Sequence, residues 1–265
     1  MCAVARYSDY DDFAFFYNKY WGKGCCELII PILDKLLLPK LAKGAHILDL
    51  CCGTGQIAQA LTELGYRVTG IDGSAEMIRY AEQNAPKAKF FVADARYFKL
   101  PQEFDATIST SDSLNHVMNI NELTDVFFNV YAVLKPGGWF LFDLNREKTY
   151  ELRNQKVTSI VKPDHVCVVR GIYKPSKKIG EFQVTTFRLV GEWERRDLKL
   201  LQKCHSRSTV KQALKRVGFT EVQTFDMRNK LFAKLEAPFI VFLCRKPSAL
   251  SNQQEAASDL QPKDT

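Results

Sequence analysis

The stretch HILDLCCGTGQIAQAL, residues 46–61, contains a strand pattern, a turn and a helix pattern in immediate succession. An apolar run containing Asp49 is followed by small residues around Gly53 and Gly55, and apolar residues then return at helical spacing. Glycine lets a ligand approach the backbone of a turn closely, and the first N–H groups of the following helix are free to meet that ligand. This order predicts a strand, a ligand-binding turn and a helix.

The same alternation continues along the chain. Strand-like apolar runs lie at 46–50, 66–72, 89–94, 104–110, 139–145, 221–227 and 239–246. Segments with helical spacing lie at 56–65, 74–85, 121–135 and 208–218. Strands that alternate with helices are joined by right-handed crossovers, which place the strands in parallel. We therefore predict an α/β fold with a doubly wound, mostly parallel seven-stranded sheet and helices on both faces.

Two stretches depart from this alternation. Residues 10–24 and 25–39 have the pattern of two amphipathic helices. Residues 146–207 lack the alternation and have the pattern of antiparallel strands, which we expect to form a lid over one edge of the sheet. The predicted parts are N-terminal helices that close the site (1–43), a ligand-binding core (44–145), the lid (146–207), the C-terminal part of the core (208–246) and a disordered tail (247–265).

Composition limits the class of protein. The 265 residues are 46% hydrophobic and 25% charged, which fits one globular domain with an insertion. No apolar run reaches the roughly 20 residues needed to cross a membrane. The first residues lack the basic and apolar order of a signal peptide, so we expect a soluble, cytoplasmic protein with no membrane contact. The eight cysteines have no C-x-x-C spacing, which predicts buried thiols and no metal site.

Carboxylates close three successive strand patterns, as Asp49, Asp72 and Asp94. In an open parallel sheet, ligands bind beyond the carboxyl ends of the strands. A carboxylate after the second strand suits a ribose diol, and one after the third suits the exocyclic amine of a base. Together they predict a nucleoside-containing cofactor across this edge.

Two cofactors fit the turn. Gly53-x-Gly55-x-x-Ala58, followed by Asp72, matches the loose dinucleotide fingerprint of dehydrogenases. Asp49, however, lies just before the turn, where it would repel a pyrophosphate and attract the cationic amino group of an amino acid. This favours S-adenosylmethionine over a dinucleotide.

Five motifs carry a family resemblance. In order, LDLCCGTG, GIDGSAEMI, FVADAR, FDATISTSDSLNH and LKPGGWFLFDL resemble the motifs of class I, Rossmann-like S-adenosylmethionine-dependent methyltransferases of the small-molecule type. The resemblance covers about residues 10–145 and the last two strand patterns. It departs from the usual D-x-G-x-G-x-G at one position, because Cys51 replaces the first glycine. A Cβ is tolerated there if the backbone stays strand-like.

The resemblance implies a set of cofactor-binding residues. They are Tyr17, Trp21, Asp49, Cys51, Gly53, Gly55, Asp72, Gly73, Met77, Asp94, Ala95, Thr110 and Ser111. Asp49 would lie near the ammonium group, Asp72 near the ribose hydroxyls and Asp94 near the adenine amine. Met77 would pack on the adenine, and Tyr17 would close over the cofactor. Each aspartate alone also fits a helix cap or loop residue, and the apolar residues also fit core packing.

Methyl transfer requires the protein mainly to align and desolvate the acceptor and to take up a proton, so no metal is required. His116 follows the fourth strand pattern, where the acceptor should lie, and histidine suits a general base. A packing role is the other interpretation. In the lid we expect Tyr150, His205 and Arg207 to contact the acceptor. The sequence STSDSLNH lacks the Asn/Asp-Pro-Pro-aromatic motif of enzymes that methylate bases, which argues against a nucleic-acid substrate.

The net charge of +7 is concentrated in one segment. Residues 146–216 hold 18 Lys or Arg and 7 Asp or Glu, a net charge of +11. This segment either attracts an anionic acceptor or RNA, or forms a solvated lysine face. The favoured hypothesis is methyl transfer to N or O of a small-molecule acceptor. The alternatives are an RNA methyltransferase and a non-catalytic cofactor-binding protein; the sequence does not fix the oligomeric state.

Overall fold

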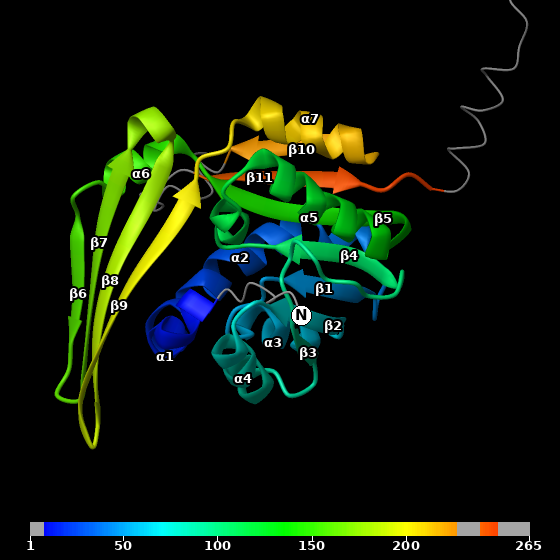
Figure 1. Cartoon of the computed structure of the whole chain (residues 1–265). Helices are drawn as coiled ribbons and strands as arrows, with labels where there is room; N and C mark the ends of the chain where they lie inside the picture. The colour runs from blue at the N-terminus through cyan, green and yellow to red at the C-terminus, as the bar shows by residue number, and fades with distance from the viewer. Residues whose placement is uncertain (1–7, 227–238, 249–265) are drawn as a thin grey trace, which may run out of the picture.

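The centre of the molecule is a seven-stranded sheet (Figure 1). A computed structural model describes residues 8–226 and 239–248. The strands are β1 (His46–Leu50), β2 (Arg67–Asp72), β3 (Lys89–Val92), β4 (Phe104–Ser109), β5 (Leu134–Asn145), β10 (Thr220–Asp226) and β11 (Phe239–Arg245). Their order is β10-β11-β5-β4-β1-β2-β3. Among these strands, only β11 runs in the direction opposite to the other six. The predicted fold is confirmed.

Helices cover both faces of this sheet. They are α2 (Gly22–Leu36), α3 (Gln56–Glu63), α4 (Ala75–Asn84), α5 (Ile120–Val133) and α7 (Arg207–Val217). On one face, Phe127 of α5 packs against Phe140 and Phe142 of β5. On the other face, Leu33 of α2 and Leu61 of α3 belong to a second apolar cluster. Burial of two separate apolar layers fixes the sheet in the middle of the core.

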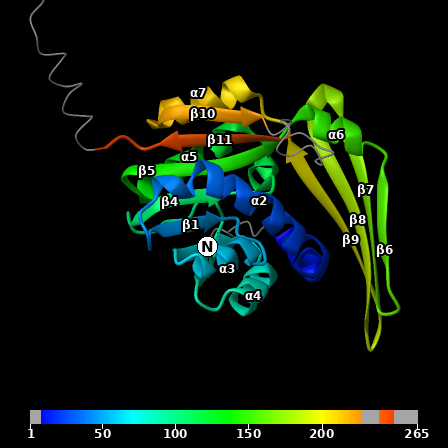
Figure 2. The same ribbon diagram turned by 180° about the vertical axis from the view of Figure 1, so that it is seen from behind.

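A second, four-stranded antiparallel sheet stands beside the core (Figures 1 and 2). Its strands, in spatial order, are β6 (Val157–Val161), β7 (His165–Lys174), β8 (Ile179–Val190) and β9 (Glu192–Lys203). Antiparallel strands thus occupy the segment where they were predicted. The sequence pattern missed two features. The helix α6 (Glu147–Arg153) precedes the sheet. A hairpin turn at Gly191, with φ +78°, separates β8 from β9 within an apolar run that had looked like a single strand.

The N-terminal helical segment, residues 8–36, lies between the two sheets (Figure 1). It changes pitch from a 3₁₀ turn (η1, Ser8–Phe13) through α1 (Ala14–Phe16) and a π-helical turn (η2, Tyr17–Trp21) into α2. Its second helix therefore begins at Gly22 rather than at residue 25. Phe13 and Phe16 pack against Cys167, Val184 and Leu200 of the four-stranded sheet. This contact ties the N-terminal helical segment to the insertion.

The ends of the chain are described only in part. Residues 249–265, most of the predicted tail, and Cys2 lie outside the described residues. All seven cysteines in the described part are free thiols. No helix in the described ranges is long and apolar enough to cross a membrane.

Candidate functional site

The glycine turn, residues 51–55, joins β1 to α3. Gly53 and Gly55 have φ values of +54° and +81°, in the left-handed region that favours glycine. A Cβ on Gly55 would lie 2.8 Å from the Ala81 Cα in α4, so a larger residue does not fit there. A Cβ on Gly53 would lie 3.4 Å from the Tyr17 ring. Bare backbone therefore lets α4 and the N-terminal helical segment close onto the turn.

Cys51 has a left-handed backbone, with φ +61°, and not the strand-like conformation that we expected. For a residue with a Cβ, this conformation costs about 1–2 kcal/mol. The glycine that the resembled family carries at this position would adopt it without that penalty. Cys51 nevertheless keeps the glycine-like path of the chain, and its side chain packs against the apolar cluster on the α5 face.

Asp49 is a buried carboxylate without a complete set of partners. It lies in β1 with an exposed fraction of 2%, and its Oδ2 has no hydrogen-bond partner among the described residues. Burial, followed by the charge of Asp72, raises the pKa of Asp49 to about 7. A buried unpaired carboxylate is costly, and a cation placed against it would remove that cost.

Asp72 fastens the glycine turn to the start of α4. Its Oδ2 accepts a hydrogen bond from Gly53 N at 2.9 Å, and its Oδ1 accepts from Ser74 N, also at 2.9 Å, across Gly73. Burial raises the pKa of Asp72, and the two backbone donors act in the opposite direction. The Ser74 hydroxyl in turn caps α4 by accepting from Met77 N. Asp72 is thus a bracing residue as well as a candidate ribose ligand.

The other predicted cofactor residues along this edge are largely occupied by the protein itself. Asp94 accepts from Arg96 N at 2.9 Å and from the Arg96 guanidinium at 2.7 Å. Met77 and Thr110 are buried, and Ala95 packs against the apolar cluster on the α5 face. An adenine amine that met Asp94 would therefore share the carboxylate with Arg96.

Two further polar residues clamp the N-terminal helical segment onto this edge. Asn18 Oδ1 accepts from Gln56 Nε2 and from Asn84 Nδ2, both at 2.7 Å. Asp11 Oδ1 accepts from the Ser74 hydroxyl at 2.5 Å. Sequence reasoning missed both clamps because the partners are 38 to 66 residues apart. The only signal was the position of Asn18 after Tyr17, where the resembled family usually has aspartate.

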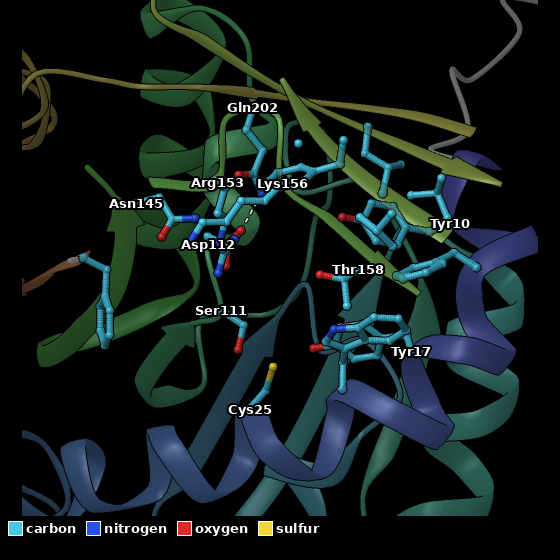
Figure 3. A pocket seen from close by; sticks show the side chains of 18 of the residues that line it. Tyr10, Tyr17, Cys25, Ser111, Asp112, Asn145, Arg153, Lys156, Thr158 and Gln202 are labelled. Carbon is cyan, nitrogen blue, oxygen red and sulfur yellow. Dashed lines mark hydrogen bonds between the residues drawn. The ribbon is translucent and has the colours of Figure 1, made fainter. Parts of the chain in front are cut away.

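A cavity of about 770 Å³ lies between the N-terminal helical segment, the ends of β4 and β5, and the four-stranded sheet (Figure 3). Its apolar lining includes Phe13, Trp21, Phe182, Val184 and Leu200. Its polar lining includes Tyr10, Tyr17, Ser111, Asp112, Asn145 and Gln202, with Arg153 and Lys156 as cations. Three predicted cofactor residues, Tyr17, Trp21 and Ser111, thus line it. The wide π-helical turn carries both Tyr17 and Trp21.

His116 belongs to a hydrogen-bond network beside this cavity. Its Nε2 lies 2.7 Å from the Tyr10 hydroxyl and 3.1 Å from Gln202 Nε2, and the same Gln202 nitrogen donates to Asp112 Oδ2 at 2.5 Å. Tyr10, Asp112 and Gln202 line the cavity, whereas His116 does not. Beneath them, Asp143 Oδ2 accepts from Asp112 N, and burial raises the pKa of Asp143 to about 8. The network brings four elements together at one end of the cavity.

Comparison with known proteins agrees with this geometry. Residues 47–138 match the family model described as a methyltransferase domain. Residues 47–138 are thus the methyltransferase domain of this chain, within a Rossmann-like fold.

Relatives extend the likeness of the methyltransferase domain. A protein of Bacillus subtilis described as the putative methyltransferase YqeM is 39% identical over 115 residues, 42% of this chain and 47% of that protein. A putative methyltransferase of a Geobacillus species is 28% identical over 224 residues, 81% of this chain and 90% of that protein. The match to the first thus spans about half of that relative's length.

A solved structure shares the fold over most of this chain. It is the structure of SAM-bound CalS10, an amino pentose methyltransferase from Micromonospora echinaspora, with a TM-score of 0.67 and 16% identity. The alignment covers 88% of this chain and 96% of that one. At this identity the likeness shows the fold alone.

The residues of the methyltransferase domain fit S-adenosylmethionine, the cofactor of the family. The orphaned oxygen of Asp49 is suited to an ammonium group, and Asp49 lies just before the left-handed turn at Gly53 and Gly55. An unpaired buried carboxylate is costly in a protein that binds nothing at this place. When bound, the cofactor supplies an electrophilic methyl group on a sulfonium.

The residues expected to contact the acceptor lie elsewhere in the insertion. Tyr150 of α6 is buried, with its ring against Gly180 and stacked on Tyr173 at 5.9 Å. His205 Nε2 donates to the Val117 carbonyl at 2.8 Å, and Arg207 lies 3.9 Å from Asp226. None of the three predicted residues is among those that line the cavity.

The insertion contributes other polar side chains to the cavity, chiefly Arg153, Lys156, Thr158 and Gln202. Gln202 had a readable signal. It follows Leu198 and Leu200 at a spacing of two residues, so all three side chains lie on the same face of β9, which is the core side. Arg153 and Lys156 had none, since they lie where α6 ends, a helix that the pattern did not predict.

Proposed function

We propose that this chain transfers a methyl group from S-adenosylmethionine to nitrogen or oxygen of a small-molecule acceptor. The observation that carries the proposal is the cavity of about 770 Å³. Its wall includes Tyr17, whose ring also lies against Gly53 of the glycine turn, so one side chain contacts both the cofactor turn and the cavity. The four-stranded sheet forms the opposite wall, as we expect of a lid.

In this proposal the protein holds, orients and desolvates its ligands. Asp49 holds the ammonium group, while Asp72, Met77 and Asp94 hold the nucleoside. The aromatic wall of Phe13, Trp21 and Phe182 excludes water from the acceptor. His116 acts through Tyr10 and Gln202, which stand between its ring and the cavity, and so positions the acceptor end or draws a proton from it.

An anionic acceptor is favoured by the charges at the cavity. Arg153 and Lys156 have no carboxylate within 4.0 Å in the described part of the chain. Several other cations of the insertion are paired, as in Lys174 with Glu181 and Lys178 with Glu147. Cations that line a cavity without a partner attract an anion from solution.

The cavity also separates this proposal from the two alternatives. A non-catalytic binding protein has no need of an open acceptor cavity, and CalS10, which shares the fold, is named as acting on a small sugar. An RNA methyltransferase would use several free cations as a phosphate footprint. Its RNA affinity would fall steeply with salt, and a flat response between roughly 50 and 200 mM salt would contradict this alternative.

The test is a calorimetric titration with S-adenosylmethionine, S-adenosylhomocysteine and, as a control, NADH. We expect the first two to bind and NADH not to bind. A panel of small amines, alcohols and acids is then incubated with protein and S-adenosylmethionine, and release of S-adenosylhomocysteine is measured. Failure of both nucleosides to bind would contradict the proposal, and so would binding without turnover on any acceptor class.

A further inference from the structure

We propose that the acceptor is an amine that also carries an anionic group. Its nitrogen binds the side-chain oxygen atoms of Gln202 and Asp112, and its anionic group binds Arg153 and Lys156. This inference rests on the proposed function and narrows it. Figure 3 shows Gln202, Asp112 and Asn145 on one side of the cavity, with Tyr10 and Tyr17 across from them.

The orientation of the Gln202 amide follows from its neighbours. The Asp112 carboxylate accepts hydrogen bonds, so the Gln202 nitrogen, and not its oxygen, must face it. The second hydrogen on that nitrogen is directed to His116 Nε2, 3.1 Å away. Both amide hydrogens of Gln202 are therefore bonded within the protein, and only the amide oxygen remains to bind a ligand.

That oxygen has no partner of its own. Gln202 has an exposed fraction of 2%, and its Oε1 is buried without a hydrogen-bond partner among the described residues. Leaving a buried carbonyl unpaired costs about 1–3 kcal/mol. Gln202 lines the cavity, so a small rotation of its side chain would bring the oxygen to a ligand N–H or O–H there.

Two neighbouring groups at this end also accept hydrogen bonds. His116 Nε2 faces two donors, the Tyr10 hydroxyl at 2.7 Å and the Gln202 amide, so this nitrogen acts as an acceptor within the network. Asp112 is a carboxylate and lines the cavity. Asn145, which also lines the cavity, adds a buried donor, because its Nδ2 has no hydrogen-bond partner among the described residues, and an anionic oxygen of the ligand would accept from it.

Two acceptors at one end favour an amine over an alcohol. A neutral primary amine has two hydrogens, one each for Gln202 Oε1 and Asp112, and keeps its lone pair for the methyl group. A hydroxyl has a single hydrogen and can donate to only one of these two oxygen atoms. Rejection of a ligand that leaves a buried polar group unpaired is a strong source of specificity.

The anionic group of the ligand is inferred from the charges of the lining. Arg153 ends α6, Lys156 follows in the next turn, and neither has an ion-pair partner within the described ranges. The Arg153 guanidinium lies 5.8 Å from the centre of the Phe182 ring, which lines the cavity together with Val184 and Leu200. The ligand therefore combines an amine, an apolar body and an anionic group.

The experiment measures binding to the full chain saturated with S-adenosylhomocysteine, by ligand-observed NMR. The probes are several aromatic and aliphatic scaffolds, each as an amino acid, the matching hydroxy acid and the matching amine without a carboxylate, such as phenylalanine, phenyllactate and phenethylamine. We expect amino acids to bind about tenfold more tightly than either partner, as one charge-assisted hydrogen bond would give. Equal or weaker binding of the amino acids, or binding by no scaffold, would overturn the proposal.

Paired variants assign the preference to these residues. Gln202→Met should reduce the preference for amine over hydroxyl to within about twofold, since it removes the amide oxygen at similar volume. Gln183→Met makes the same change on β8, where Gln183 bonds Glu181 instead, and should leave the preference intact. Lys156→Met, at an exposed position, should reduce only the preference for the anion, and Lys162→Met is its control.

The outcomes separate the two proposals. If the chain binds S-adenosylmethionine but methylates hydroxy acids in preference to amino acids, the amine inference fails and the proposed function stands. If it binds no S-adenosylmethionine, the proposed function itself fails. An amine preference that survives Gln202→Met would also contradict the inference, provided that the variant melts cooperatively.

Discussion

The cofactor edge and the acceptor cavity are built in different ways. At the cofactor edge, Asp72 and Asp94 are held by backbone N–H groups near the strand ends, and Asn18 and Asp11 add contacts to residues far along the chain. At the cavity, the contacts join distant parts of the chain, such as Tyr10 to His116 and Gln202 to Asp112. The buried Gln202 oxygen has no partner among the described residues.

This difference indicates where selectivity lies. A site whose polar groups are already satisfied is preorganised and can bind one invariant ligand without rearrangement. A cavity with an unsatisfied oxygen and unpaired cations gains most from a ligand that supplies the missing partners. Asp49 is the exception at the cofactor edge, and it is therefore the first place to test the comparison.

Asp49→Asn should have the largest effect. Loss of the carboxylate opposite the ammonium group is expected to weaken S-adenosylmethionine binding about 100-fold, as for a buried charge-assisted pair. The free protein should melt at a higher temperature at pH 8, because an ionised, unpaired and buried carboxylate has been removed. Titration calorimetry and thermal melting measure the two effects.

Asp105→Asn is the matched control for Asp49→Asn. Asp105 lies in β4 and is paired with Lys135 Nζ at 2.7 Å and with His46 N at 2.8 Å. Its substitution should lower stability and leave cofactor affinity unchanged. Unchanged affinity in Asp49→Asn would mean that the orphaned oxygen has another role.

Asp72→Ala should weaken S-adenosylmethionine binding about 30-fold, as expected for loss of a hydrogen-bonded ribose ligand. From the sequence alone we expected the fold to be unaffected. The structure changes that expectation, because Asp72 accepts from Gly53 N and Ser74 N, and leaving these donors unpaired should destabilise the protein by about 1–3 kcal/mol. Calorimetry and denaturant unfolding measure affinity and stability separately; loss of stability with full affinity would place the ribose elsewhere.

His116→Ala should reduce turnover about 20-fold on any accepted substrate, since general-base or positioning groups contribute at least this much. Tyr10 and Gln202 lose a shared partner, and neither of them is a predicted cofactor residue. The affinity for S-adenosylhomocysteine should therefore stay within about twofold. Steady-state kinetics with calorimetry test this split, and an unchanged rate would leave packing as the role of His116.

Cofactor affinity should depend on pH through Asp49. Its pKa of about 7 is raised above the value in the unfolded chain, so its contribution to stability is fully present below about pH 4 and is lost as pH rises through 7. Ammonium binding needs the ionised form, so the affinity for S-adenosylmethionine should rise about tenfold from pH 6 to pH 8. Calorimetry at three pH values measures this, and Asp49→Asn should abolish the dependence. A flat profile in the unmodified chain would contradict the assigned pKa.

The sequence was sufficient for the core because the deciding features are local. Each glycine, strand-end aspartate or helix cap lies next to the strand or helix that positions it, and periodicity places each on that element. The sequence was insufficient for the cavity, where Tyr150, His205 and Arg207 were chosen by type and region. Apart from Gln202, the residues of the insertion that face inward depend on register and on α6, and neither was readable from the pattern.

Cys51→Gly should have the smallest effect. It tests whether the glycine turn is stabilised by its own backbone conformation or by the apolar residues around it. Glycine removes the penalty that a residue with a Cβ has in the left-handed conformation, about 1–2 kcal/mol. It also loses the contact of the Cys51 side chain with the apolar cluster on the α5 face, and it gives the unfolded chain more conformational freedom. We therefore expect the free energy of unfolding to rise by less than about 1 kcal/mol. Cys52→Gly, at the next residue without a left-handed backbone, should instead destabilise the protein. Denaturant unfolding compares the two. If Cys51→Gly destabilised the protein as much as Cys52→Gly does, packing of the thiol would outweigh backbone strain, and the turn would depend on its apolar surroundings as the cavity does.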